Sequence, residues 1–196
     1  MKIKNINYVA FQPGFEKFAN TYHGFIPARD SFLQQNVSDF YEIKNGNFSE
    51  KSIVTIPDGC TDIMFAFDGN DMKIYISTGV RVIKKFYFGS LAYLFGIRFK
   101  PGCTYHIFRE KIKKFVHKPV NANHILKDSH MIAEKMALSK NFNERIRIGE
   151  EYLKKNLLEQ SMQGNLLDYC VKSICDANGN MQVTNFQQTR DIRLAI

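Results

Sequence analysis

Two apolar runs constrain the fold of this chain more than any other feature. Residues 52–67 read SIVTIPDGCTDIMFAF, and residues 86–103 read FYFGSLAYLFGIRFKPGC. Each run contains a glycine turn beside a cysteine, at residues 57–60 and 101–103, and proline and glycine suit the φ angles of such turns. Aromatic and β-branched residues dominate both runs, so we expect buried strands in a sheet and not helices.

Other short strands and turns surround these two runs. We expect a strand over residues 32–43 that ends at the Asn45-Gly46 turn, and residues 73–78 alternate apolar and polar side chains. Residues 68–71, with the sequence DGND, are a typical hairpin turn. Several short strands at regular spacing predict a barrel or a sandwich.

The character of the sequence changes after residue 102. Residues 103–115 and 143–158 place apolar side chains three to four positions apart, which is typical of amphipathic helices. Asn141 or Asn143 can cap the second of these helices, and a shorter helix covers 166–175. We therefore predict an α+β protein in which strands precede helices. The apolar stripe of the helix over 143–158 suits either the core or a dimer seam, and we favour the core.

Composition and charge narrow the class of protein. The chain has 196 residues, of which 44% are hydrophobic, so it is long enough for one well-cored domain and too apolar for long disorder. The net charge of +8 suits contact with nucleic acid or other anions, although a lysine-rich genome would give the same value. The sequence has four cysteines without CxxC spacing, no export-type N-terminus and no membrane-length apolar run. These features predict a cytoplasmic protein with reduced thiols.

The order and spacing of three motifs resemble one branch of the AraC/XylS-type transcriptional regulators. In that branch a Pro-Asp-Gly-Cys-x-Asp motif precedes a Gly-hydrophobic-Arg-Phe-x-Pro-Gly motif, and an Asn/Glu-Arg pair follows in a helical segment. The matching positions here are Pro57, Asp58, Gly59, Cys60 and Asp62, then Gly96, Arg98, Phe99, Pro101 and Gly102, then Glu144 and Arg145.

The resemblance covers roughly residues 30–160 and implies a sensory domain that controls transcription. It implies a cupin-like β-barrel over residues 1–120, a helical dimerisation or packing segment over 121–160, and a linker with the incomplete start of a helix-turn-helix domain over 161–196. The implied partners are promoter DNA, through a C-terminal domain that we expect to be missing here, a small-molecule effector and a second copy of the chain. We expect no enzymatic activity, no cofactor and no membrane contact.

Two other interpretations stay open. The chain can be a stand-alone cupin-like small-molecule-binding protein or enzyme, which a bound metal or a retained ligand would favour. It can also be a structural or dimerisation module, which an interior filled by Phe and Leu side chains would favour.

The tentative effector-binding residues are Asp58, Cys60, Asp62 and Arg98. A lone charge inside an apolar strand is costly, so Arg98 either pairs with Asp62 or Asp58 or offers its fork of donors to an anionic effector, and we favour pairing. Neighbouring carboxylates disfavour the thiolate of Cys60, which favours a structural role over a nucleophile. The sequence has no zinc-type spacing and no His-x-His pair, so we expect neither a metal site nor catalytic residues.

Overall fold

The computed structural model describes residues 12–14, 21–28, 31–44, 52–69, 71–78, 82–87, 93–104, 108, 119–123, 125–158 and 166–182. The strands are β1 (Tyr22–Phe25), β2 (Val37–Lys44), β3 (Ser52–Thr55), β4 (Thr61–Asp68), β5 (Asp71–Thr78), β6 (Lys84–Tyr87), β7 (Tyr93–Phe99) and β8 (Val120–Asn121). The helices are α2 (Ser129–Leu138), α3 (Phe142–Leu153) and α4 (Leu166–Asp176), with a 3₁₀ turn η2 (Phe32–Gln35) and a π-helical turn η4 (Lys154–Leu158). The protein is therefore α+β, as predicted.

Six strands form one antiparallel sheet in the order β1-β2-β7-β4-β5-β8. Strand β7 lies in the middle, where Ile97 stands opposite Phe40 of β2 on one side and Ile63 of β4 on the other. The two apolar runs of the sequence thus supply the adjacent strands β4 and β7. A separate two-stranded sheet joins β3 to β6.

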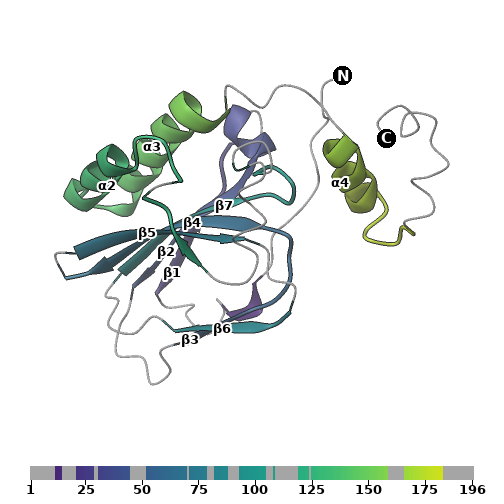
Figure 1. The fold of residues 1–196 in the computed structure, drawn as a ribbon, viewed down its shortest axis with the longest axis horizontal. Helices are drawn as coiled ribbons and strands as arrows, with labels where there is room; N and C mark the ends of the chain where they lie inside the picture. Colours follow the sequence, from purple (N-terminus) through teal and green to yellow (C-terminus); the bar gives the residue numbers. More distant parts are fainter. Residues whose placement is uncertain are drawn as a thin grey trace.

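Helices α2 and α3 cover one face of the six-stranded sheet, and the β3–β6 ribbon lies on its other side (Figure 1). This arrangement explains why residues 94–99 of β7 are all buried, since side chains on both faces of a central strand are covered. The largest core packs between the sheet and the helices. It includes Phe40, Ile63, Phe65, Phe95, Ile97, Phe99, Ile132, Met136, Ile146, Ile148, Tyr152 and Leu153.

The apolar stripe of α3 belongs to this core, as predicted, because Ile146, Ile148 and Leu153 are all buried. Helix and sheet approach each other closely at Gly149, where an added Cβ would lie 3.1 Å from the Phe40 ring. A small residue on α3 therefore lets the helix lie directly on the central strands. None of the described helices is long and apolar enough to cross a bilayer.

Three glycine positions and one helix cap in the described residues follow the sequence. Gly59 has a φ of +71°, and Gly69 has a φ of +59° in the predicted hairpin between β4 and β5. Asn141 caps α3, because its side-chain oxygen accepts a hydrogen bond from the Glu144 amide at 2.9 Å. Gly179 ends the α4 region with a φ of +77°. These residues act locally, which is why their roles can be predicted from short stretches of sequence.

The prediction of a closed barrel is wrong for the described strands. The outer strands β1 and β8 of the six-stranded sheet pair neither with each other nor with the β3–β6 ribbon. Closure is unnecessary for burial here, because α2 and α3 cover one sheet face. Alternating apolar strands bury a face in either architecture, so the pattern alone could not distinguish them.

The start of one predicted strand differs in the structure, and one predicted helix cannot be compared. The strand expected from residue 32 begins only at Val37, because the η2 turn precedes it, with the Ser31 hydroxyl accepting from the Gln34 amide at 3.2 Å. The helix expected over 103–115 lies largely outside the described residues.

Candidate functional site

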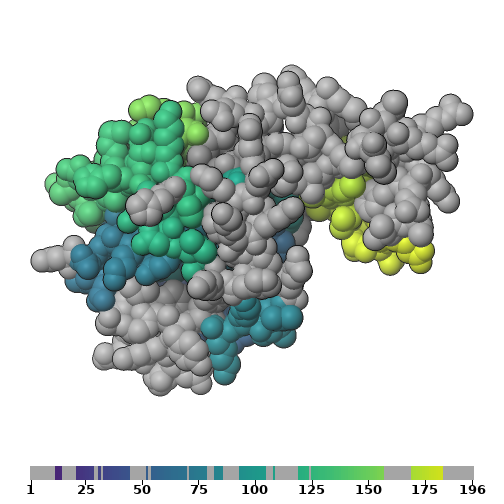
Figure 2. Space-filling view, in the orientation of Figure 1, coloured from purple at the N-terminus to yellow at the C-terminus, as the bar shows by residue number. Residues whose placement is uncertain are grey.

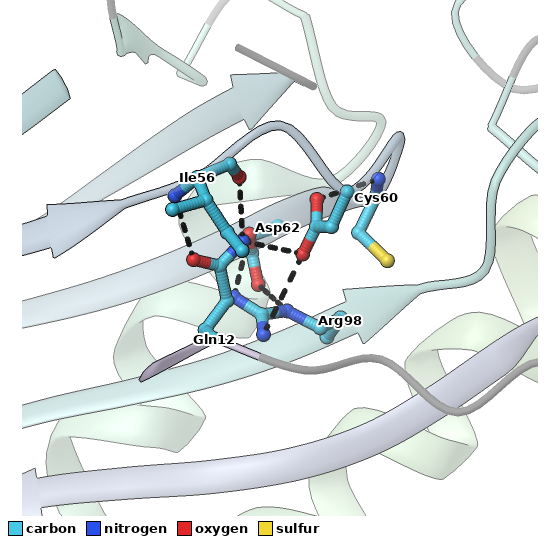
Figure 3. A network of polar contacts seen from close by, with 6 residues as sticks. Gln12, Ile56, Cys60, Asp62 and Arg98 are labelled. Carbon is cyan, nitrogen blue, oxygen red and sulfur yellow. Dashed lines mark hydrogen bonds and ion pairs between the residues drawn. The ribbon is translucent and has the colours of Figure 1, made fainter. Parts of the chain in front are cut away.

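A buried ion pair joins the two motif-bearing strands (Figure 3). Asp62 on β4 and Arg98 on β7 are register partners, and Arg98 Nε donates to Asp62 Oδ1 at 2.9 Å. Arg98 Nη2 donates to Asp62 Oδ2 at 3.4 Å, and Arg98 Nη1 lies 4.0 Å from Asp58 Oδ2. The Arg98 side chain is only 5% exposed. The predicted pairing of Arg98 with Asp62 or Asp58 is confirmed, and Asp62 is the closer partner.

Polar contacts on both sides hold Asp58 beside this pair. Gln12 Nε2 donates to Asp58 Oδ2 at 2.6 Å and to the Ile56 carbonyl at 2.8 Å, while the Ile56 amide donates to Gln12 Oε1 at 2.9 Å. The Cys60 amide donates to Asp58 Oδ1 at 2.9 Å, a local turn that Asp favours. A glutamine from the N-terminal part of the chain therefore fixes the loop before β4 (Figure 3).

Asp39 brings a third carboxylate to the same region. It is the register partner of Arg98 on β2, next to an irregularity in the β2–β7 pairing. Within the described structure, Asp39 Oδ1 is buried and has no hydrogen-bond partner. Asp58 and Asp62 lie within 4.0 Å of the Arg98 guanidinium, and Asp39 interacts with it electrostatically. We call Asp39, Asp58, Asp62 and Arg98 the Arg98 cluster.

The Tyr41 ring lies beside Arg98, and the Tyr22 ring stacks on Tyr41. Arg98 Cζ lies 5.5 Å from the centroid of the Tyr41 ring, a distance at which a cation is attracted to an aromatic face. The Tyr22 ring stacks on Tyr41 with centroids 6.1 Å apart. A Cβ added at Gly96 would overlap the Tyr41 ring. Glycine in the second motif therefore makes room for the ring that lies over Arg98.

Burial and charge act in opposite directions on the ionisation of these groups. Burial raises the pKa of Asp39 to about 6, even though the Arg98 charge opposes the rise. Burial likewise raises the pKa of Asp62 against the attraction of Arg98. Burial alone would lower the pKa of Arg98, but the charges of Asp62, Tyr41 and Asp39 and the hydrogen bond to Asp62 together outweigh burial and keep that pKa above its ordinary value. Arg98 therefore stays charged, and Asp39 titrates near the neutral range.

The four tentative effector-binding residues lie together but have different roles. Asp58, Asp62 and Arg98 form the charged group, whereas Cys60 is 3% exposed and supplies its backbone amide to Asp58. An anionic ligand would have to displace a buried carboxylate to take the donors that Arg98 gives to Asp62. In the described residues, no three His, Cys, Asp or Glu side chains converge in a way that could hold a metal ion.

Sequence reasoning missed Gln12, Asp39 and Tyr41. Asp39 carried a signal, because a carboxylate within the buried strand β2 is as unusual as Arg98 within β7. The roles of Gln12 and Tyr41 depend on residues far along the chain, so no local pattern could reveal them.

A second polar cluster lies around Glu42 on β2, which is 3% exposed. Its carboxylate accepts from Tyr93 Oη at 2.5 Å and from His23 Nδ1 at 2.8 Å, and Lys44 Nζ lies 3.3 Å away. Burial alone would raise the pKa of Glu42, but the hydrogen bonds from Tyr93, His23 and Lys44 together bring it below its ordinary value. A buried charge is thus stabilised where β1, β2 and β7 lie side by side.

Arg145, in the third motif, connects α3 to the sheet through its side-chain contacts. Its Nη1 donates to Tyr93 Oη at 3.2 Å and its Nη2 to the Ser139 carbonyl at 3.1 Å. Its guanidinium also lies 4.4 Å from the Tyr93 ring centroid and 5.3 Å from that of Phe67. Glu144 accepts from the Lys140 amide at 2.8 Å at the start of the helix. The Glu-Arg pair therefore anchors the helical layer.

The described structure defines a class of protein: an antiparallel sheet with a helical layer on one face and a buried charge cluster between its central strands. Residues 25–121 match the model of a family described as a domain of unknown function, DUF6597. The matched segment contains the motif-bearing strands β4 and β7 and ends before α2. No curated protein and no solved structure matches the chain.

Proposed function

We propose that this chain is the effector-sensing and dimerisation portion of an AraC-type DNA-binding transcriptional regulator that works in the cytoplasm. In this proposal the sheet senses a small molecule, the helical layer carries the dimer contact, and residues 161–196 lead into a helix-turn-helix domain. That C-terminal domain binds promoter DNA, and the sensory part catalyses no reaction.

One observation carries the proposal: the three motifs of the resemblance meet on neighbouring elements. Asp62 of the first motif pairs with Arg98 of the second across β4 and β7. Arg145 of the third motif contacts Tyr93 on the same strand β7. Motifs that matched by chance would have no reason to share contacts. Their contacts with one another support the proposal that all three motifs belong to one regulator-type sensory domain.

Strand β7 offers a route between the sensed molecule and the helices. Arg98 lies near its C-terminal end and Tyr93 at its start, where Arg145 of α3 docks. An effector that binds beside Tyr41 and Asp39 and competes for the Arg98 cluster would alter the strand that holds α3. Such coupling requires the effector to bind two arrangements of the protein with different affinity.

The mass of the protein made from its natural gene tests the proposal. A mass well above 22.7 kDa, with the extra sequence encoding two helix-turn-helix units, supports a regulator. A mass of 22.7 kDa removes the DNA reader. That result would favour a stand-alone small-molecule-binding protein or enzyme, since the Arg98 cluster would remain while the DNA-binding part would not.

A further inference from the structure

The turn after β7 brings a lysine and a cysteine together. Residues 100–103 read KPGC, and the Cys103 amide donates to the Lys100 carbonyl at 3.2 Å. Pro101 and Gly102 take the two central positions, and Gly102 has a φ of +80°, as in a type II turn. Such a turn brings the α-carbons of its first and last residues within about 7 Å of each other. The turn therefore holds Lys100 and Cys103 close together.

Lys100 is a buried lysine that lies directly after β7. It is only 7% exposed, and among the described residues no hydrogen bond or ion pair reaches its ammonium. Burial lowers the pKa of Lys100, and the charge of a Cys103 thiolate opposes this fall. A buried charge costs free energy unless an opposite charge or a hydrogen bond compensates it. The Lys100 ammonium therefore favours a negative charge at the position of the Cys103 sulfur.

Cys103 has different surroundings from Cys60 and Cys175. The Cys103 side chain is half-buried, and its sulfur donates to the Gln35 carbonyl at 3.7 Å, a weak contact at the protein surface. Cys60 is only 3% exposed, while burial and the Asp176 charge raise the pKa of Cys175. Reactive cysteines are typically partly exposed and lie beside a positive charge. Cys103 combines both of these properties.

We propose that Cys103 is a modification site, at which the thiol reacts with a small disulfide that carries carboxylates. The Cys103 thiolate attacks one sulfur of the reagent, and the S–S bond of the reagent breaks. A new S–S bond joins Cys103 to one half of the reagent, while the other half leaves as a thiolate and takes up a proton. Cys103 is thereby oxidised and the released half is reduced, so the reaction needs no further oxidant. Lys100 favours the attacking thiolate and attracts the carboxylates of the reagent.

The turn that carries Cys103 also packs on helix α4. A Cβ added at Gly102 would lie 2.8 Å from Val171 Cγ2, so the turn has no spare room beside this helix. Helix α4, yellow in Figure 2, lies at the opposite end of the molecule from α2 and α3. A group attached at Cys103 would therefore act on α4 first. The regulatory meaning of this contact rests on the proposed function, in which residues 161–196 lead into the helix-turn-helix domain, whereas the chemistry at Cys103 does not.

Two disulfides of opposite charge, the anionic glutathione disulfide and the cationic cystamine, test the proposal on the reduced whole chain. Mass spectrometry of tryptic peptides follows each cysteine separately, since Lys172 lies between Cys170 and Cys175. We expect glutathione disulfide to modify Cys103 at least about fivefold faster than Cys170, which is also half-buried and therefore controls for access. This preference for Cys103 should fall at least about threefold with cystamine, because Lys100 repels its positive charge.

Removal of the Lys100 charge gives a second test. Lys100→Met should slow the reaction of Cys103 with glutathione disulfide about fivefold and leave Cys170 unchanged. Circular dichroism shows whether this variant keeps its fold, and the comparison of the two reagents on the unsubstituted chain does not depend on it.

Three results would overturn the proposal: equal rates at Cys103 and Cys170, the same preference with both reagents, or a folded Lys100→Met variant in which Cys103 reacts as fast as before. Each of them would leave the regulator proposal in place. A natural gene product of 22.7 kDa would refute the regulator without changing these rates.

Discussion

Replacing Arg98 by methionine tests whether the Arg98 cluster holds the central strands together. The substitution keeps much of the side-chain volume but removes the charge that pairs with Asp62 and Asp58. Removing one partner of a buried ion pair costs about 3 to 5 kcal/mol, because the remaining carboxylates stay buried without compensation. With a urea m-value of about 2 kcal/mol/M, the unfolding midpoint should fall by about 1.5 to 2.5 M.

The destabilisation should depend on pH with a definite sign. Without Arg98 the folded-state pKa of Asp62 rises further above its ordinary value, because the attraction that opposed the rise is gone. An acid with a raised folded-state pKa lowers stability above its unfolded-state pKa, and this effect vanishes below that pKa. The deficit of Arg98→Met should therefore be largest near about pH 7.5 and shrink toward about pH 4.

Urea unfolding followed by circular dichroism at both pH values measures this deficit. Arg147→Met is the matched control, because Arg147 and Glu151 are both more than half exposed, and the loss should stay below about 1 kcal/mol. Arg98→Met combined with Asp62→Asn should recover part of the deficit, since it removes one stranded carboxylate. A deficit no larger than the control, or one that does not change with pH, would refute the reasoning.

Three further substitutions test other parts of the structure by the same unfolding assay. Asp39→Asn should stabilise the fold at neutral pH by up to about 3 kcal/mol, which is the free energy that corresponds to a pKa of about 6 in place of 3.8. This gain in stability should disappear as the pH falls from 6 to below 4, because Asp39 then becomes neutral. A gain that stays constant with pH would contradict the assigned titration of Asp39. Gly96→Ala should destabilise by about 1 to 3 kcal/mol or more, because its Cβ overlaps the Tyr41 ring, and an unchanged midpoint would show that the ring moves freely. Asn141→Ala should cost about 0.5 to 2 kcal/mol through the lost cap, whereas the exposed Asn143→Ala should not; equal losses would rule out capping.

Local chemistry explains how much of the fold could be predicted from the sequence. The glycine turns before β4 and between β4 and β5, and the cap at Asn141, depend on neighbouring residues, and all appear in the structure. The pairing of Arg98 could also be predicted, because burying a charge in an apolar strand costs much free energy unless an opposite charge lies beside it.

Whether the sheet closes into a barrel could not be predicted, because the apolar pattern of a strand indicates which face is buried but not which element covers that face. Helices α2 and α3 cover the face that a barrel would have enclosed. The same limit applied to the site: Gln12 reaches Asp58 across a long sequence separation, and Asp39 meets Arg98 only through the register of β2 and β7. Long-range register brings such residues together, and no short window of sequence contains it.

Recovery of DNA from the cells that make this protein tests the central claim most directly. The natural gene product would be tagged in place, crosslinked to DNA in its own cells and isolated, and the attached DNA would be sequenced. A sensory portion of a transcriptional regulator predicts a small set of promoter fragments enriched well above an untagged control. DNA at the level of that control, from cells in which the tagged protein is abundant, would contradict the account.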